Sequence, residues 1–484
     1  MIKKWPIKID RHRGFCPKYY ENSYPSFGNK GQAGDMRNMS LMDPSVLSPG
    51  PGMAELTNGD QGGAVTTLIK GILRHAVSAD VSFAVGGAKL YKFSSTAVNS
   101  GGSPSWPRTI TDNGSELGED VCYYQSKLYY SYNQTGAVGN IGQYDLSSTF
   151  DDDWYETVAT SGAALQSAPH QMINGGDDVM YIANGIYIAT LDGTTASPQG
   201  LDFFVNAQVV TISWNYNRVI CGVNRPNLTG ANANQSAVYR WDGFSTSWEG
   251  DPIEVNGRIG AFYTKNGITY IWYEEFEAGT ARLKFGMLSG GRIEPIRSFS
   301  GSLPLYYQVG ELGDFIIWLS GQRLYAFGPL SGEIKSDMFQ LMSPQYATAG
   351  GLATPFGKVL IASNATTNYS LEYESGYATD AYYYTLLWQT ALNAMKSQVD
   401  KIELNTDVLA TGARVDLTLK NNVGTSLWTD LMSFAADGAI TKKTFYPRCS
   451  GENVRLEYGH SNGSSTNPVK VRNTHIEGRN ISSG

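Results

Sequence analysis

The sequence of 484 residues predicts an all-β protein whose main body is a seven-bladed β-propeller. Glycine (54 residues) and tyrosine (30) are abundant and charged residues make up only 17%, a composition typical of β-proteins with many turns. One hairpin pattern also recurs along the chain. The length exceeds that of one ordinary core, so we expect an extended N-terminal arm (residues 1–63), the β-propeller (64–377) and a C-terminal β-sandwich (378–484).

The clearest hairpin signal is DVMYIANGIYIATLDG, residues 178–193. Apolar runs flank Asn184-Gly185, and both residues accept the positive φ of a type I′ turn. The pattern recurs in six further stretches, of which the last three are weaker: residues 83–93, 122–132, 317–327, 209–223, 268–286 and 357–373. Seven units in this region give a period of about 45 residues, which fits four-stranded propeller blades. Their spacing is irregular, so six to eight blades fit, and a large many-hairpin sandwich is the alternative.

The N-terminal region differs in charge from the rest. Its first 20 residues hold six basic side chains against Asp10, so they carry +5, and the remaining residues carry −12 of the total of −7. Pro49-Gly50-Pro51-Gly52 is expected to exclude regular structure. Aromatic and basic residues of the arm are our candidate interface residues: Lys3, Lys4, Trp5, Arg11, Arg13, Tyr19 and Tyr20. A first strand that closes the ring, followed by a loop, is an equal alternative.

The C-terminal region has a second pattern. Residues 385–399 fit either a helix or the start of a strand, and we leave this segment open. Strict alternation at 414–420 and 454–458 predicts strands of a smaller β-sandwich. Alternation from Val469 runs into Ile-Glu-Gly-Arg (476–479), so we interpret these residues as native sequence rather than the remnant of a protease-cleavage tag.

The sequence shows no catalytic or metal-binding motif. The five histidines are isolated: His12, His75, His170, His460 and His475. Asp151-Asp152-Asp153 lacks calcium-loop spacing and is expected to be a solvated turn, and Glu274, Glu275 and Glu277 could supply the paired carboxylates of a glycosidase. We predict no cofactor, no metal and no enzymatic activity.

Cysteine usage and hydropathy bear on the cell compartment. Cys16, Cys122, Cys221 and Cys449 are far apart, which favours idle thiols over a disulfide framework. No apolar run approaches the ~18 residues that span a bilayer, and the basic start lacks the apolar segment of a secretion signal. We therefore expect no membrane span and assembly in a reducing cytoplasm.

The Gly/Tyr/Asn-rich hairpins, the stretch VYRWDGFSTSW (238–248) and the terminal sandwich resemble propeller-bearing virion proteins of tailed bacteriophages. The resemblance is one of composition and domain order over the whole chain, and it includes no motif from which residue roles could be transferred. It implies a structural protein of the tail, neck, nozzle or tail tip that is made in the host cytoplasm. Its partners would be copies of itself and other virion proteins, and its place would be the virion.

Three further hypotheses accompany this one. If several copies line a channel, the acidic composition would repel DNA passing through it without specific binding. The alternative function is a carbohydrate-binding or glycan-cleaving receptor-binding tail protein, which needs aromatic residues and paired carboxylates on one face. A cellular propeller scaffold or a secreted lectin is a third class.

Overall fold

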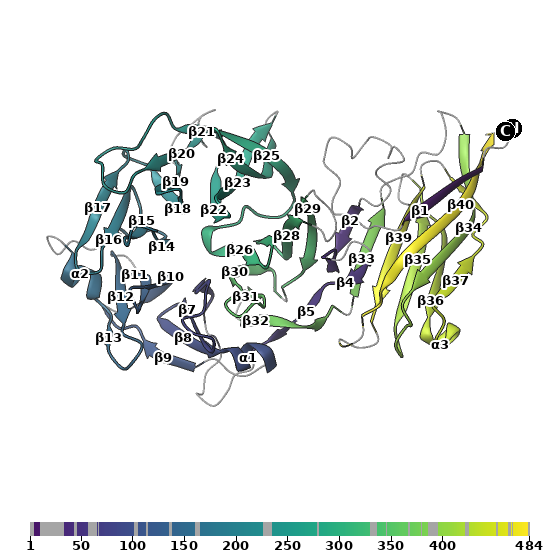
Figure 1. Cartoon of the computed structure of the whole chain (residues 1–484), viewed down its shortest axis with the longest axis horizontal. Coiled ribbons are helices and arrows are strands. Elements are labelled where there is room, and N and C mark those ends of the chain that lie inside the picture. Colours follow the sequence, from purple (N-terminus) through teal and green to yellow (C-terminus); the bar gives the residue numbers. More distant parts are fainter. Residues whose placement is uncertain are drawn as a thin grey trace.

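The computed structural model describes most of the chain outside the first 32 residues. The described residues are 4–9, 33–42, 46–56, 65 and 67–482, with gaps at 101–104, 113–114, 135–137, 160–164, 226–234, 278–279, 330–335, 345, 366–367, 379, 386–394, 422–424, 452–453, 463–465 and 467. Figure 1 shows a ring of sheets joined at one side to a sandwich. Among these residues, no helix has the length and hydropathy of a membrane span.

Seven four-stranded antiparallel sheets form the ring, which confirms the seven-bladed propeller. The first four blades are β6 (Ile69–Ile72), β7 (Val81–Gly86), β8 (Lys89–Ser94) and β9 (Ser105–Thr109); β10 (Glu116–Tyr124), β11 (Lys127–Gln134), β12 (Gly139–Tyr144) and β13 (Phe150–Asp151); β14 (Met172–Asn174), β15 (Met180–Asn184), β16 (Tyr187–Leu191) and β17 (Ala196–Asp202); and β18 (Gln208–Asn215), β19 (Arg218–Asn224), β20 (Gln235–Trp241) and β21 (Ile253–Asn256).

The remaining three blades complete the circle. They are β22 (Ile259–Lys265), β23 (Ile268–Glu277), β24 (Thr280–Ser289) and β25 (Arg292–Phe299); β26 (Val309–Leu312), β27 (Phe315–Ser320), β28 (Arg323–Pro329) and β29 (Ser336–Met342); and β30 (Thr348–Ala353), β31 (Leu360–Ala365), β32 (Asn368–Tyr377) and β5 (Pro51–Glu55). The first strands of successive blades contact one another, and β30 of blade 7 returns to β6 of blade 1. The three short helices α1 (Ser95–Ser100), α2 (Trp154–Val158) and α3 (Phe434–Asp437) lie outside this framework.

The fourth strand of blade 7 comes from the N-terminal segment. β5 pairs with β32 through Ala54↔Tyr373, so it closes the ring as the alternative hypothesis proposed. The expectation that Pro49 to Gly52 exclude regular structure is wrong for Pro49, Pro51 and Gly52, which lie in strands. Pro51 is the first residue of an outermost strand, a position where the missing N–H leaves no ladder bond unmade.

The irregular spacing of the hairpins has a simple cause. The landmark Leu-Tyr or Ile-Tyr pair lies at the start of the third strand in blades 1, 3 and 6, but at the start of the second strand in blade 2, where Leu128-Tyr129 belongs to β11. The turn after Asn184 also differs from the predicted type I′. Asn184 pairs with Tyr187, and only Gly185 has positive φ (62°), which fits a type II′ turn around Gly185 and Ile186.

The sandwich consists of two sheets, and both include strands from the segment predicted as an arm. One sheet has the order β1 (Lys4–Ile9), β40 (Val471–Ser482) and β34 (Met395–Thr406). Both β37 (Lys442–Phe445) and β38 (Cys449–Gly451) pair with β34 along its other edge. The other has β2 (Ala33–Arg37), β33 (Asp380–Thr385), β39 (Arg455–Ser461), β35 (Arg414–Lys420) and β36 (Ser426–Ser433). The described part of residues 1–63 is therefore built into both bodies. Of the segment left open, residues from Met395 onward form a strand.

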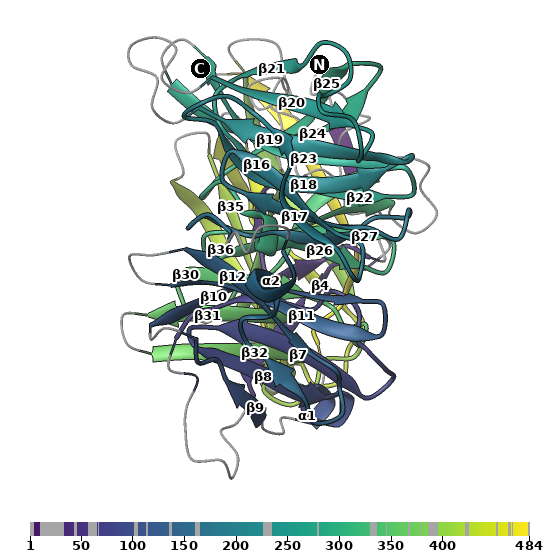
Figure 2. The same cartoon turned by 90° about the vertical axis from the view of Figure 1, so that its left-hand side faces the viewer.

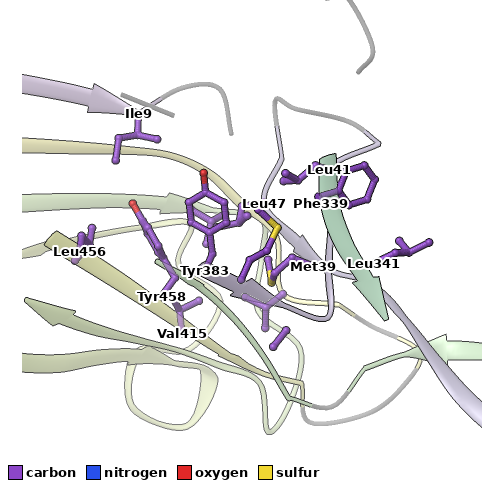
Figure 3. Close-up of a cluster of buried hydrophobic side chains, with 14 of the residues drawn as sticks. Ile9, Met39, Leu41, Leu47, Phe339, Leu341, Tyr383, Val415, Leu456 and Tyr458 are labelled. Carbon is purple, nitrogen blue, oxygen red and sulfur yellow. The ribbon is translucent and has the colours of Figure 1, made fainter. Parts of the chain in front are cut away.

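A single hydrophobic cluster joins the propeller to the sandwich (Figure 3). Met39 and Leu41, in and after β3 (Met39–Ser40), lie between Phe339 of blade 6 and Tyr383 of the sandwich, and all four side chains are buried. β3 pairs with β4 (Ser48–Pro49), and Leu47 exchanges two 2.9 Å backbone hydrogen bonds with Val471 of β40. The N-terminal segment thus packs against both bodies at once.

The outer edge of the propeller is protected against further strand pairing. Four of the seven outermost strands contain proline: β5 (Pro51), β9 (Pro107), β17 (Pro198) and β25 (Pro295). β13 and β21 are only two and four residues long. The remaining one, β29, is covered by β2, β3 and β5. Because proline and short length both discourage strand addition, contacts with other molecules are expected on the loop faces of the ring.

The shared cluster predicts cooperative unfolding. We expect Phe339→Ala to lower the free energy of unfolding by about 3–5 kcal/mol through cavity formation, and the wild-type protein to unfold in one calorimetric transition. Val205→Ala, at an exposed position, is the control and should change stability by less than about 0.5 kcal/mol. Two separate wild-type transitions would contradict a common core.

Candidate functional site

The centre of the ring holds a group of charged side chains. Register shifts in the innermost strands β6 and β10 leave Lys70 and Glu119 outside the regular ladder. Lys70 Nζ lies 2.5 Å from Glu119 Oε1, and Asn133 Nδ2 donates to the same oxygen at 3.3 Å. Arg74 lies over the ring of Tyr263, with 5.2 Å between the guanidinium carbon and the ring centroid. Both cations are thus engaged by neighbours within the ring.

Asp120 is the most perturbed of the central carboxyl groups. Its side chain accepts hydrogen bonds from the backbone N–H of Val121 at 2.9 Å and of Met172 at 2.8 Å. Burial raises the pKa of Asp120 to about 7, although these two donors and the charge of Arg74 act in the opposite direction. Glu119 turns toward Lys70 in blade 1 while Asp120 turns toward blade 3. The two carboxylates are therefore held by different partners rather than facing one substrate position.

A single 3₁₀ turn occupies the centre at this level. Residues Tyr306–Gln308 contact β6, β22 and β30, and the Tyr306 hydroxyl donates to the backbone oxygen of Glu119 at 3.3 Å across the ring. Gln308 Nε2 donates to Ala349 O at 2.7 Å. Because Tyr306 is fully buried, this turn packs the middle of the propeller.

The other predicted carboxylate sites are structural. Glu274 forms a two-point ion pair with Arg258 at 2.6 and 2.7 Å, while Glu275, the next residue of β23, faces the other side and pairs with Lys284. Glu274 and Glu275 therefore do not face one another, and the side chain of Glu277, at the end of the same strand, lies outside the described part of the chain. Asp152 is buried, not solvated: Arg108, Tyr130 and the backbone of Thr111 donate to its carboxylate. The expectation of a solvated turn is therefore wrong for Asp152.

Histidine and cysteine do not converge on a metal site in the described part of the chain. His170 is buried and burial lowers its pKa to about 4; its Nε2 lies 2.8 Å from Gln166 O. His460 is also buried, His75 is exposed, and His12 and Cys16 lie outside the described residues. Cys122, Cys221 and Cys449 are free thiols.

Most of the predicted interface residues lie outside the part of the chain that the structure describes. Lys3, Arg11, Arg13, Tyr19 and Tyr20 lie outside the described residues. Lys4 and Trp5 belong to β1, whose backbone pairs with Arg479 and Gly478 of β40. The outer side of β1 is the edge of its sheet, and lysine and proline at residues 4, 6 and 8 are residue types that discourage a further strand there.

A surface patch on blades 4 and 5 was not found from sequence. We call it the Tyr216 patch; it consists of the exposed side chains of Tyr216, Phe244 and Ile268 and of the half-buried Trp214 of β18. Tyr216 is 81% exposed and Phe244 84% exposed, among the highest values of any large apolar side chain described. Neighbouring strands of a blade are antiparallel, so the turn between its first and second strands and the loop between its third and fourth strands lie on the same face of the ring. Tyr216, Phe244 and Ile268 lie in or beside such turns and loops.

The base of this patch is well fixed. Buried Tyr181 stacks on Trp214, with 5.6 Å between ring centroids, and its hydroxyl donates to Asp177 Oδ2 at 2.5 Å. Tyr216 lies over Gly267 of blade 5, where an added Cβ would come within 2.3 Å of its hydroxyl. Tyr216 and Asn217 both have positive φ (47° and 58°), a conformation that is uncommon for a bulky side chain. An aromatic residue at the centre of a two-residue hairpin turn was the available sequence signal.

Carboxylates surround the Tyr216 patch. Asp177 and Asp178 precede β15, Asp242 lies in the loop that carries Phe244, and Glu249 pairs with Arg218 at 2.6 Å. Asp242 accepts backbone N–H bonds from Phe244 and Ser245 at 3.0 and 2.8 Å, and Asp177 accepts from Val179 as well as Tyr181. Aromatic residues and carboxylates therefore do meet on one face, although both carboxylates are engaged by their own loops.

No family model and no curated protein match this chain. Among solved structures, it is similar to an exo-β-1,3-galactanase from Phanerochaete chrysosporium (11% identity, 89% of this chain and 99% of that one, TM-score 0.34). It is also similar to the extracellular domain of a putative one-component system from B. thetaiotaomicron (12% identity, 75% of this chain and 44% of that one, TM-score 0.46). A third similar structure is Drosophila Semaphorin 1b (9% identity, 68% of this chain and 87% of that one, TM-score 0.42). These values transfer no activity, substrate or partner to this chain.

One expectation is corrected by the comparison. We predicted that this chain is not an enzyme, yet the similar structures include an enzyme, the galactanase, solved with galactose and with β-1,3-galactotriose. The prediction is therefore withdrawn.

The pKa of Asp120 predicts how stability depends on pH. Below about pH 4 an aspartate is protonated in both the folded and the unfolded chain, and between about 4 and 7 only the unfolded chain ionises freely. The contribution of Asp120 to stability should therefore fall as the pH rises through this window and stay low above it. Asp120→Asn should lose less stability than the wild type between about pH 4.5 and 8, measured by urea unfolding. Equal losses would show that Asp120 does not titrate in this range.

Proposed function

We propose that this chain is a structural protein of a tailed-bacteriophage virion, placed in the tail or neck and acting through assembly contacts. The observation that carries the proposal is the hydrophobic cluster that joins blade 6, the N-terminal segment and the sandwich. A buried interface of this kind holds the two bodies in one orientation, whereas separate domains usually move relative to each other. A fixed orientation suits a part that must place two contact surfaces in an assembly.

The shape of the propeller supports contacts through its faces. The outer strands resist strand addition, so neighbours would meet the loops and exposed side chains instead. The central turn with Tyr306 packs the middle of the ring, so any passage for DNA would lie between copies. The acidic composition of the body fits such a passage because it repels phosphate.

A second candidate function is carbohydrate recognition or cleavage by a receptor-binding tail protein. The specific observation in its favour is the Tyr216 patch, where exposed aromatic rings lie beside Asp177 and Asp242. Its test is a glycan array with the wild-type chain and with Tyr216→Asn. Saturable binding by the wild type, lost in the variant, would favour this candidate.

The virion proposal predicts a fixed number of copies in a particle. Density-gradient-purified phage particles from the culture that carries the gene should contain this chain in constant ratio to the other virion proteins, measured by quantitative mass spectrometry. Antibodies against the purified chain should label the tail or neck in electron micrographs. Particles that lack the chain would overturn the proposal. Deletion of residues 1–63 is not a suitable assembly test, because it removes β1, β2 and β5 from their sheets.

A further inference from the structure

The molecule has a second exposed apolar patch, and it lies in the sandwich. Val408 (59% exposed) follows β34, and Ile440 (40% exposed) precedes β37. The two loops meet where the Thr406 N–H donates to Thr441 O at 2.8 Å. We call Val408 and Ile440 the Val408 patch. Both side chains are aliphatic, and they sit on loops rather than on the sheet faces that form the core.

Basic side chains flank the Val408 patch. Lys442 pairs with Glu403 at 2.7 Å, and Arg472 makes a two-point pair with Asp407 at 2.7 and 2.9 Å. The backbone of Lys470 accepts the Asp407 N–H at 2.9 Å, so this residue adjoins the same loop. Lys442, Arg472 and Lys470 therefore adjoin the Val408 patch together with Glu403 and Asp407. Asp177, Asp178 and Asp242 lie beside the Tyr216 patch, where Arg218 is paired with Glu249.

The two patches belong to different bodies of the molecule. The Tyr216 patch lies on blades 4 and 5 of the ring, and α3, which precedes Ile440 in the chain, lies in the sandwich (Figure 1). Figure 2, a view from the propeller end, shows α2 of blade 2 in front and the sandwich behind the ring. A molecule cannot bring its own two patches together, since the shared core fixes the two bodies relative to each other.

We propose that the Tyr216 patch of one copy binds the Val408 patch of a second copy, which joins copies head to tail. Aromatic side chains at the centre of an apolar contact are effective anchors, and complementary charge around them sets the orientation. Because the two surfaces differ, the contact is heterologous and generates a closed ring or an open filament. The inference deepens the proposed assembly role and rests on it.

A second copy fits the Tyr216 patch better than a sugar does. Asp177 and Asp242 already accept hydrogen bonds from their own loops, so fewer of their oxygens are available for sugar hydroxyls. Their negative charge still acts over several ångströms on a basic surface. Exposed apolar side chains outside a cavity are also typical of protein contacts.

The test uses the full-length chain in sedimentation velocity at several concentrations. The wild type should associate, and the association should weaken as salt increases. Tyr216→Asn with Phe244→Ser, and separately Val408→Ser with Ile440→Ser, should each lower the association constant at least about tenfold. Asn accepts positive φ and all four positions are exposed, so folding should be retained. Tyr446→Ser, at an exposed position outside both patches, is the matched control and should associate like the wild type.

Mixing the two double variants gives the decisive result. Each retains one intact patch, so the mixture should form a 1:1 dimer and nothing larger. A wild type that stays monomeric at all concentrations, or a mixture that fails to dimerise, would overturn the head-to-tail contact. Glycan-array binding that depends on Tyr216 would assign the patch to a carbohydrate instead. The particle analysis is independent: a chain found in virions but monomeric in solution would refute this contact and leave the virion role standing.

Discussion

Burial of the N-terminal segment between two bodies is the interaction on which the rest of the structure depends. Met39 and Leu41 can leave water only where Phe339 of blade 6 and Tyr383 of the sandwich face the same space. The same stretch of chain continues into β5, which closes the ring. Ring closure and domain orientation are therefore one event: the last blade is completed by the segment that also anchors the sandwich. Loss of this packing would open the ring and release the sandwich together.

The consequences extend to the surface. A closed ring removes most strand edges, and proline or short length protects those that remain on its rim. The one long outer strand without such protection, β29, is the one that the N-terminal segment covers. Contacts with other molecules are left to turns and loops, where Tyr216 and Phe244 project. The fold thus directs association toward its faces without any specialised domain.

Much of the fold could be predicted because hairpins are local. The period near 45 residues and the seven hairpins identify the propeller, since each hairpin is set by neighbours in sequence. Closure of the ring by a strand from residues 1–63 was one of two equal alternatives, but the specific pairings of β1 with β40 and of β5 with β32 could not be predicted, because each joins residues more than 300 positions apart. Proline at residue 51 even pointed away from a strand. Sequence shows that Pro51 lacks an N–H but not that it stands at an edge, where no N–H is needed.

The candidate site was harder to predict because the role of a side chain depends on whether it is exposed, which the sequence does not show. Carboxylates attract attention in a sequence, yet Glu274 and Asp152 turn out to hold arginines within the propeller. Tyr216 resembles its many tyrosine neighbours, and only the structure shows it 81% exposed with positive φ. Neither property stabilises the fold: exposure forfeits the hydrophobic gain, and positive φ costs conformational energy. Within the chain Tyr216 lies over Gly267, and most of its surface stays available for a contact outside the chain, so the Tyr216 patch is the surface where we look for a partner.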